Sequence, residues 1–134
     1  MLRSQSYALL GLLCLLLSGC QSGKPGEPKK YPVSGTVTLD GQPVNENGLI
    51  YFKTVATGAI DGFEIKAGKF SGRTEPGERR VEIEVFQVTV KDFNGMKGES
   101  RDSLIPASYN TDSKLTATIN PAGPNEFKFE LKSK

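Results

Sequence analysis

The chain offers few residues that could carry out acid–base or nucleophilic chemistry. It contains no histidine, which removes the commonest general base, the commonest metal ligand and every nucleophile–histidine pair. Glu82 and Glu84 are two residues apart and would share one face of a strand, where paired carboxylates can transfer protons. Because Arg79, Arg80 and a neighbouring strand would offset their charge, we interpret the pair as part of a solvated sheet face. We therefore predict no catalytic residue and no cofactor.

Carboxylates also gather in and beside one long segment near the middle of the chain. Oxygen ligands of this kind can bind Ca²⁺, but their spacing matches no calcium-binding loop. We interpret them as solvated loop charges and predict no metal site. The residues are Asp92, Glu99, Asp102 and Asp112.

The segment Lys91–Ser113 is expected to be a long loop, and loops longer than about 12–15 residues are commonly functional. It is the candidate binding loop, with Phe93 and Tyr109 as its candidate contact residues. In a second interpretation, Ile105, Pro106 and Tyr109 pack against one end of the domain and the Tyr109 hydroxyl holds that corner.

Alternation of apolar and polar residues dominates from residue 31 onward, and no segment has a helical period. Turn signals separate the segments, notably Asp40-Gly41-Gln42-Pro43 and Asn94-Gly95. The pattern predicts an all-β fold of about seven strands, in two antiparallel sheets packed face to face or in a partly open barrel. The expected strands are Tyr31–Leu39, Gly48–Lys53, Ile60–Lys66, Gly68–Gly72, a long strand from Pro76-Gly77 to Val90, Leu115–Ile119 and Phe127–Leu131.

The long strand changes its apolar parity part of the way along. Apolar residues occupy odd positions in Val81–Val85 and even positions in Phe86–Val90. A switch of this kind inside one strand requires an extra residue if both halves face the core. The sequence therefore predicts a bulge or bend near Val85–Gln87.

The N-terminus has the three zones of a secretion signal. Arg3 precedes the apolar stretch Ala8–Leu17, which is too short for a transmembrane helix of roughly 20 residues. Leu17-Ser18-Gly19-Cys20 then resembles the lipobox of bacterial lipoprotein precursors at every position. An ordinary signal peptide followed by a chance cysteine is the alternative.

The lipobox resemblance implies that residues 1–19 are cleaved as a signal peptide and that Cys20 carries a lipid. In that family a diacylglycerol is attached to the cysteine thiol and the new amine is usually acylated, so several acyl chains hold the protein on a membrane. Gln21 after the cysteine resembles the pattern for export to the outer membrane. Residues 20–30 are polar and rich in Pro and Gly, which indicates a flexible linker or a segment whose lysines touch anionic lipid.

The remaining chain, residues 31–134, resembles carboxypeptidase-regulatory-like and transthyretin-like β-sandwich domains. The resemblance is carried by Val33–Val44, Pro76–Ile83, Ile105–Asn110 and Asn125–Leu131, although Arg79 stands where the family usually has tyrosine. It implies a prealbumin-like Greek-key sandwich. The enzymatic branch of that fold hydrolyses hydroxyisourate with histidines and a Tyr-Arg-Gly-Ser tail, and this chain has neither.

These features lead to one functional hypothesis and one alternative. We expect a non-catalytic lipoprotein of the bacterial cell envelope that contacts other envelope proteins or glycans. The alternative is a small-molecule or carbohydrate-binding module that uses loops at one end of the sandwich. A net charge of +2, part of which is Arg3 in the signal, gives no reason to expect a nucleic-acid partner.

Overall fold

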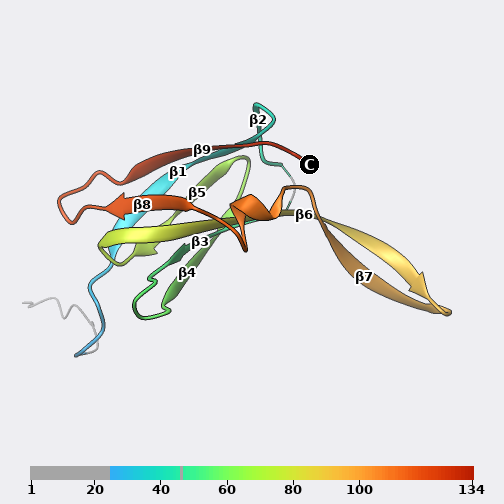
Figure 1. Ribbon diagram of the computed structural model, residues 1–134, viewed down its shortest axis with the longest axis horizontal. Helices are drawn as coiled ribbons and strands as arrows, with labels where there is room; N and C mark the ends of the chain where they lie inside the picture. Colours follow the sequence, from blue (N-terminus) through green and yellow to red (C-terminus); the bar gives the residue numbers. More distant parts are fainter. Residues whose placement is uncertain (1–24, 46) are drawn as a thin grey trace, which may run out of the picture.

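The computed structural model describes residues 25–45 and 47–134. The predicted signal peptide and Cys20 therefore lie outside the described residues. Strands make up 61% of the structure, which confirms the all-β prediction (Figure 1). The elements are β1 (Tyr31–Leu39), β2 (Gln42–Pro43), β3 (Asn47–Lys53), β4 (Ile60–Ile65), β5 (Lys69–Thr74), β6 (Gly77–Phe93), β7 (Met96–Ser103), the 3₁₀ turn η1 (Ala107–Tyr109), β8 (Leu115–Ile119) and β9 (Glu126–Leu131).

The strands form two sheets. In the four-stranded sheet, β1 is central, with β5 and the short β2 along one edge and β9 along the other. In the five-stranded sheet, β3 lies between β4 and β6. The free edge of β6 is then shared, because β8 pairs with its first residues and β7 with its last.

One pairing differs from the predicted antiparallel sheets, because β9 runs parallel to β1 from Ser34↔Glu126 to Leu39↔Leu131. The chain reaches β9 from β8, which belongs to the other sheet. A connection that crosses between sheets does not impose the antiparallel direction that a tight hairpin imposes.

The core lies between the two sheets and is formed by the alternating positions that the sequence indicates. Val33 and Val37 of β1 face Ile50 and Phe52 of β3, and all four are almost completely buried. The Phe52 ring lies 5.9 Å from that of Phe70 and 6.5 Å from that of Phe127, centroid to centroid, so aromatic contacts join the sheets. Burial of these apolar faces provides the main driving force for folding.

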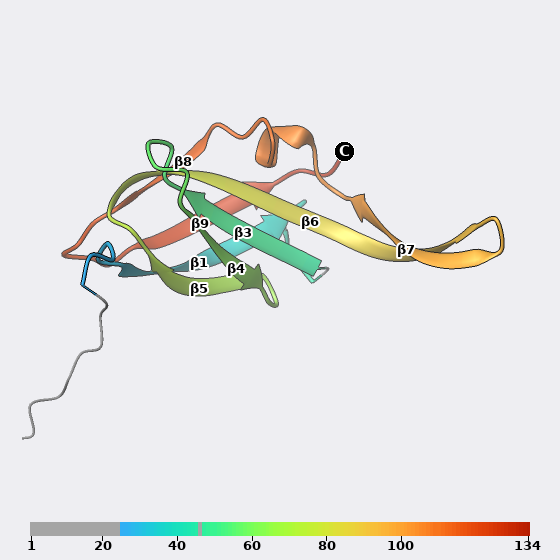
Figure 2. The same ribbon diagram turned by 90° about the horizontal axis from the view of Figure 1, so that it is seen from below.

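The predicted long loop Lys91–Ser113 is wrong for most of its length. Its first half completes β6 and forms β7, and its second half contains η1. The turn signal Asn94-Gly95 joins the two strands of a ladder that extends from Phe86↔Ser103 to Phe93↔Met96. We call residues 86–103 the projecting hairpin, because they extend away from the rest of the molecule in both views (Figures 1 and 2).

The sequence predicts a bulge or bend near Val85–Gln87, and the bulge is absent. The β3–β6 register runs without interruption to Asn47↔Phe86, and the β6–β7 register continues from Phe86 onward. No extra residue is needed, because β6 leaves the core after Val85. The apolar residues beyond that point lie on the face that Glu82 and Glu84 occupy within the sheet.

The segment that precedes β1 is exposed from residue 25 to residue 30 and forms no strand. Its last residue is attached to the folded body. Lys30 Nζ lies 2.5 Å from Asp61 Oδ1, and the Lys30 carbonyl accepts a hydrogen bond from Arg73. Within the described ranges, no helix has the length and apolar character required to cross a membrane.

Candidate functional site

The projecting hairpin forms because its turn has the conformation that two antiparallel strands require. Asn94 and Gly95 both have positive φ angles, 55° and 87°, as in the type I′ turns that match strand twist. Asp92 Oδ1 accepts a hydrogen bond from the Gly95 N–H at 2.6 Å. Phe93 and Met96 face each other directly beside the turn.

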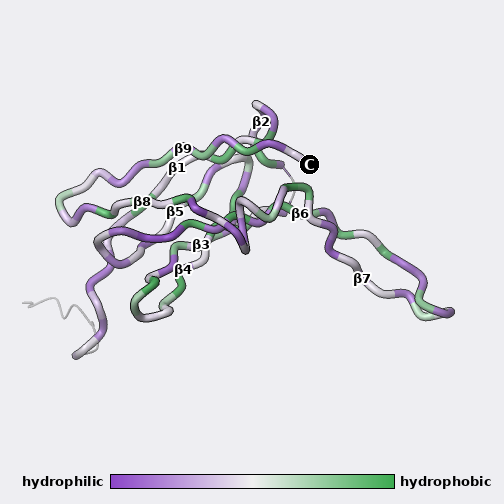
Figure 3. Tube along the Cα trace, in the orientation of Figure 1, coloured by the Kyte–Doolittle hydropathy of each residue, from purple (hydrophilic) through white to green (hydrophobic). Residues whose placement is uncertain are grey.

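Apolar side chains are exposed along the projecting hairpin. Val88, Val90, Phe93 and Met96 are between 42% and 75% exposed, and they account for most of the large apolar side chains exposed in the described residues. Figure 3 shows short hydrophobic segments among hydrophilic ones along this hairpin. Val88 and Val90 lie on one face of the hairpin and Phe93 and Met96 on the other. Exposed apolar groups that gather on one element are typical of contact surfaces.

The two faces of the projecting hairpin differ in chemistry. Phe86, Val88 and Val90 share one face, and the guanidinium carbon of Arg101 lies 4.8 Å from the centre of the Phe86 ring. This cation–π contact covers the base of the apolar row. The row continues outward to Val90, which is more exposed than Val88.

The opposite face carries a polar network centred on Asp102. Its carboxylate accepts hydrogen bonds from Thr89 Oγ1 at 2.9 Å, from Lys91 Nζ at 3.1 Å and from Ser100 Oγ at 3.2 Å. The hydrogen bond from Thr89, followed by that from Lys91, lowers the pKa of Asp102 below its ordinary value. These contacts hold β6 and β7 together beyond the core.

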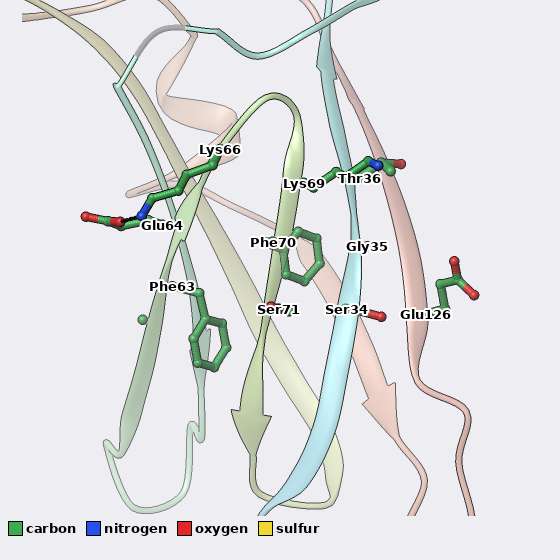
Figure 4. A pocket seen from close by; sticks show the side chains of 11 residues that line it. Ser34, Gly35, Thr36, Phe63, Glu64, Lys66, Lys69, Phe70, Ser71 and Glu126 are labelled. Atoms are coloured by element: carbon green, nitrogen blue, oxygen red, sulfur yellow. Dashed lines mark ion pairs between the residues drawn. The ribbon is translucent and has the colours of Figure 1, made fainter.

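A hollow lies on the flank where β4 of one sheet approaches β5 of the other. Its volume is about 790 Å³, and it is wide open to solvent. Figure 4 shows the rings of Phe63 and Phe70 inside it and the Glu64–Lys66 ion pair at its rim. The ion pair at the rim is exposed, so the hollow offers an aromatic floor with polar and charged groups at its edge.

The two residues of the candidate binding loop are not brought together. Phe93 lies at the tip of the projecting hairpin, whereas Tyr109 ends η1 and packs against the core. The Tyr109 hydroxyl accepts a hydrogen bond from the Lys132 N–H at 3.1 Å. Ile105 is only 1% exposed and Tyr109 packs against the core, so the second interpretation is confirmed for these two residues.

The acidic residues form no cluster. In residues 25–45 and 47–134, no group of three or more carboxylates, cysteines or histidines could hold a metal ion. Asp92 caps the hairpin turn, Asp102 belongs to the network described above, and Glu99 lies on the opposite face. Glu82 pairs with Lys53 at 2.5 Å and with Arg80 at 3.2 Å, which confirms that its charge is offset, although its side chain is largely buried rather than solvated.

The role of Arg79 was missed from the sequence. Its side chain points to the face opposite Glu82 and is buried, where it donates to the Glu75 carbonyl at 3.0 Å, to Thr54 Oγ1 at 2.8 Å and to the Pro76 carbonyl. The alternation of the strand was the available signal. Arg79 occupies an odd position, as Val81 and Ile83 do, so it lies on the core face. Its donors are used to fix loops, so Arg79 is a structural residue.

Comparison with protein-family models, with curated proteins and with solved structures found no match.

Proposed function

We propose that this protein is a lipid-anchored, non-catalytic module of the bacterial cell envelope whose contact element is the projecting hairpin. The observation that carries the proposal is the exposure of Val88, Val90, Phe93 and Met96 on an element that extends beyond the core. A lone two-stranded ribbon is marginally stable in water. A partner that covers it would explain why the chain extends β6 so far past Val85.

A binding role is also supported by how the buried polar side chains are used. Besides Arg79, the buried polar residues Thr74, Ser113 and Asn125 all make hydrogen bonds within the fold. Hydrogen bonds of this kind fix loops and strands within the fold. The Ser113 hydroxyl donates to the Val81 carbonyl and accepts from the Leu115 N–H, which joins β6 to the start of β8.

The proposal includes a prealbumin-like Greek-key arrangement of the strands. It is supported by the opening hairpin, where Asp40 and Gly41 have φ angles of 51° and 84° and β2 returns along β1. This is the turn expected from the segment Val33–Val44, which carries the family resemblance. A solved structure with the same strand order and connections would test it.

Site-specific photocrosslinking in cells tests the contact role. A photoreactive phenylalanine analogue at Val90 should form a discrete protein adduct, whereas the same probe at Val55 should not. Val55 is the matched control, because it is 80% exposed but lies in the loop between β3 and β4. The adduct should weaken when Phe93→Ser is added. Equal adducts from both positions, or none from Val90, would rule the hairpin out as the contact element.

The hollow between β4 and β5 favours the alternative function, binding of a small molecule or carbohydrate. Aromatic rings with polar neighbours suit sugar rings, which have apolar faces and hydroxyl edges. A glycan screen followed by NMR would test it, with shifts expected at Lys69 and Ser71, which line the hollow. Shifts confined to the projecting hairpin, or no binding at millimolar concentration, would contradict it.

A further inference from the structure

One long edge of the projecting hairpin has no strand beside it. In the part of the chain that the structure describes, β7 pairs with β6 alone. The Leu104 N–H donates to the Val85 carbonyl at 2.9 Å, which makes Val85 and Leu104 a hydrogen-bonded pair of the ladder. Because such pairs alternate in antiparallel strands, Ser100 and Asp102 direct their backbone groups toward β6.

The intervening residues of β7 direct their backbone N–H and C=O groups outward. They are Lys97, Glu99, Arg101 and Ser103. An exposed row of this kind is a template for another strand. The side chains of these four residues also share one face of the ribbon, the face of Val88 and Val90.

The sequence of β7 is complementary to itself in the antiparallel direction. When two copies are placed with Ser100 on a two-fold axis, Glu99 lies opposite Arg101 of the second copy, and Arg101 lies opposite its Glu99. Lys97 then lies opposite Ser103. These are also the residues with outward backbone groups, so every free N–H and C=O from Lys97 to Ser103 finds a partner. Opposite charges at facing positions stabilise a strand pair.

We propose that the projecting hairpin binds a second copy of this chain through β7, which gives a continuous four-stranded sheet in the order β6-β7-β7-β6. The proposal rests on the proposed function and names the partner of its contact element. A two-fold interface of this kind is closed, because each copy uses the same edge. A sheet needs three or more strands to be stable by itself, and the paired hairpins would supply four.

The other free edge of the hairpin is a poorer choice. Beyond Phe86, β6 has no pairing with β3, so Val88, Val90 and Asp92 direct backbone groups to that side. Antiparallel pairing about Val90 would place Val88 opposite Asp92. No opposite charges would meet along this edge, whereas two Glu99–Arg101 pairs meet along β7.

Disulfide trapping in the full chain, in its native membranes, tests the register. Ser100→Cys places two thiols at a non-hydrogen-bonded pair, where Cα atoms are about 4.5 Å apart and within reach of a disulfide. Mild oxidation should give a covalent dimer. Lys97→Cys is the matched control, because its two copies would be about 20 Å apart in this register. The native chain, which has no cysteine in the hairpin, is the background control. It measures any dimer that forms through Cys14 or Cys20.

A charge exchange provides the second measurement. In the Ser100→Cys background, Glu99→Arg and Arg101→Glu each place like charges opposite one another, and each should lower the dimer yield by at least about fivefold. The double variant Glu99→Arg/Arg101→Glu should restore it, which a purely structural role of either residue would not do. Failure of the restoration would overturn the proposed register even if Ser100→Cys forms dimers.

The two proposals fail in different ways. If Val90 forms an adduct whose mass is not that of two chains, and Ser100→Cys gives no more dimer than Lys97→Cys, the second copy is excluded and the hairpin is still a contact element. If Val90 gives no adduct and Ser100→Cys no dimer, both proposals are wrong.

Discussion

The ring of Phe63 in β4 lies directly over Gly72 in β5, so an aromatic side chain of one sheet covers a glycine of the other. A Cβ atom added at Gly72 would meet ring carbons of Phe63 closer than real Cβ atoms approach. Gly35 lies beneath the ring of Phe70, its partner on the neighbouring strand of the same sheet, and an added Cβ would be 2.8 Å from the ring carbons and would also meet the Phe127 carbonyl oxygen. Along the flank that contains the hollow, aromatic rings therefore occupy the space that a side chain would fill at each glycine.

Gly72→Ala should destabilise the protein, because the added methyl group forces the Phe63 ring away from its packed position. We expect a loss of about 1–3 kcal/mol in the free energy of unfolding, measured by urea denaturation. Gly98→Ala is the control. Its Cβ would be 3.1 Å from the exposed ring of Phe93, which can move into solvent, so the loss should be smaller. Equal losses would contradict this account.

Arg79→Met should destabilise the protein by about 3 kcal/mol, because it leaves Thr54 Oγ1 and the carbonyl groups of Glu75 and Pro76 without their donor in a buried place. Arg73→Met is the matched control, since Arg73 is exposed and donates to the Lys30 carbonyl. Its effect should stay within about 0.5 kcal/mol. A loss for Arg79→Met no larger than this would show that the buried network contributes little.

Tyr109→Phe should cost about 1 kcal/mol, because the Lys132 N–H loses its acceptor while the ring still packs. Hydrogen exchange at the Lys132 amide should accelerate. The neighbouring Ser133 amide donates to Asp40 Oδ1 and serves as an internal control, so its exchange should not change. Accelerated exchange at both amides would indicate fraying of the whole C-terminal end rather than loss of one bond.

The projecting hairpin should loosen in acid. The pKa of Asp102 is below its ordinary value of 3.8 in the folded protein, so its stabilising effect is complete above 3.8 and is lost as the pH falls through the lower folded value. Exchange of the Thr89 and Ser100 amides should accelerate in that range before exchange in the core does. Asp102→Asn should remove this pH dependence, and an unchanged acid response in that variant would assign the loosening to other groups.

Cys20→Ala should abolish the proposed lipid anchor. Cells grown with a fatty-acid probe should label the native chain, and the variant should carry no label, because the thiol that receives the diacylglycerol is gone. The variant should also wash out of the envelope fraction. Cys14→Ala is the control and should leave labelling intact, since Cys14 precedes the expected cleavage site. A native chain with the mass of the unmodified polypeptide would contradict the lipoprotein assignment.

The positions of most strands could be predicted because one face of each of those strands is buried, which is not so for β2 and β7. Alternation in Tyr31–Leu39 puts Val33 and Val37 on one face, and both are buried. In Phe127–Leu131 the charged residues alternate with the apolar ones and are exposed. The same rule misled at Val85, where the parity switch was interpreted as a bulge. That interpretation assumed that apolar residues face the core, and Val88 and Val90 do not.

Local turn chemistry and periodicity in the sequence determined which segments become strands, where Asp40-Gly41 and Asn94-Gly95 reverse the chain, and which faces are apolar. Only the tertiary structure decided that β9 lies parallel to β1, that Arg79 is enclosed by loops, and that the end of β6 pairs with β7 outside the core. The physical reason is how far apart in the sequence the interacting residues lie. Turn conformation and side-chain alternation depend on neighbouring residues, whereas sheet order and exposure depend on which distant segment occupies each edge.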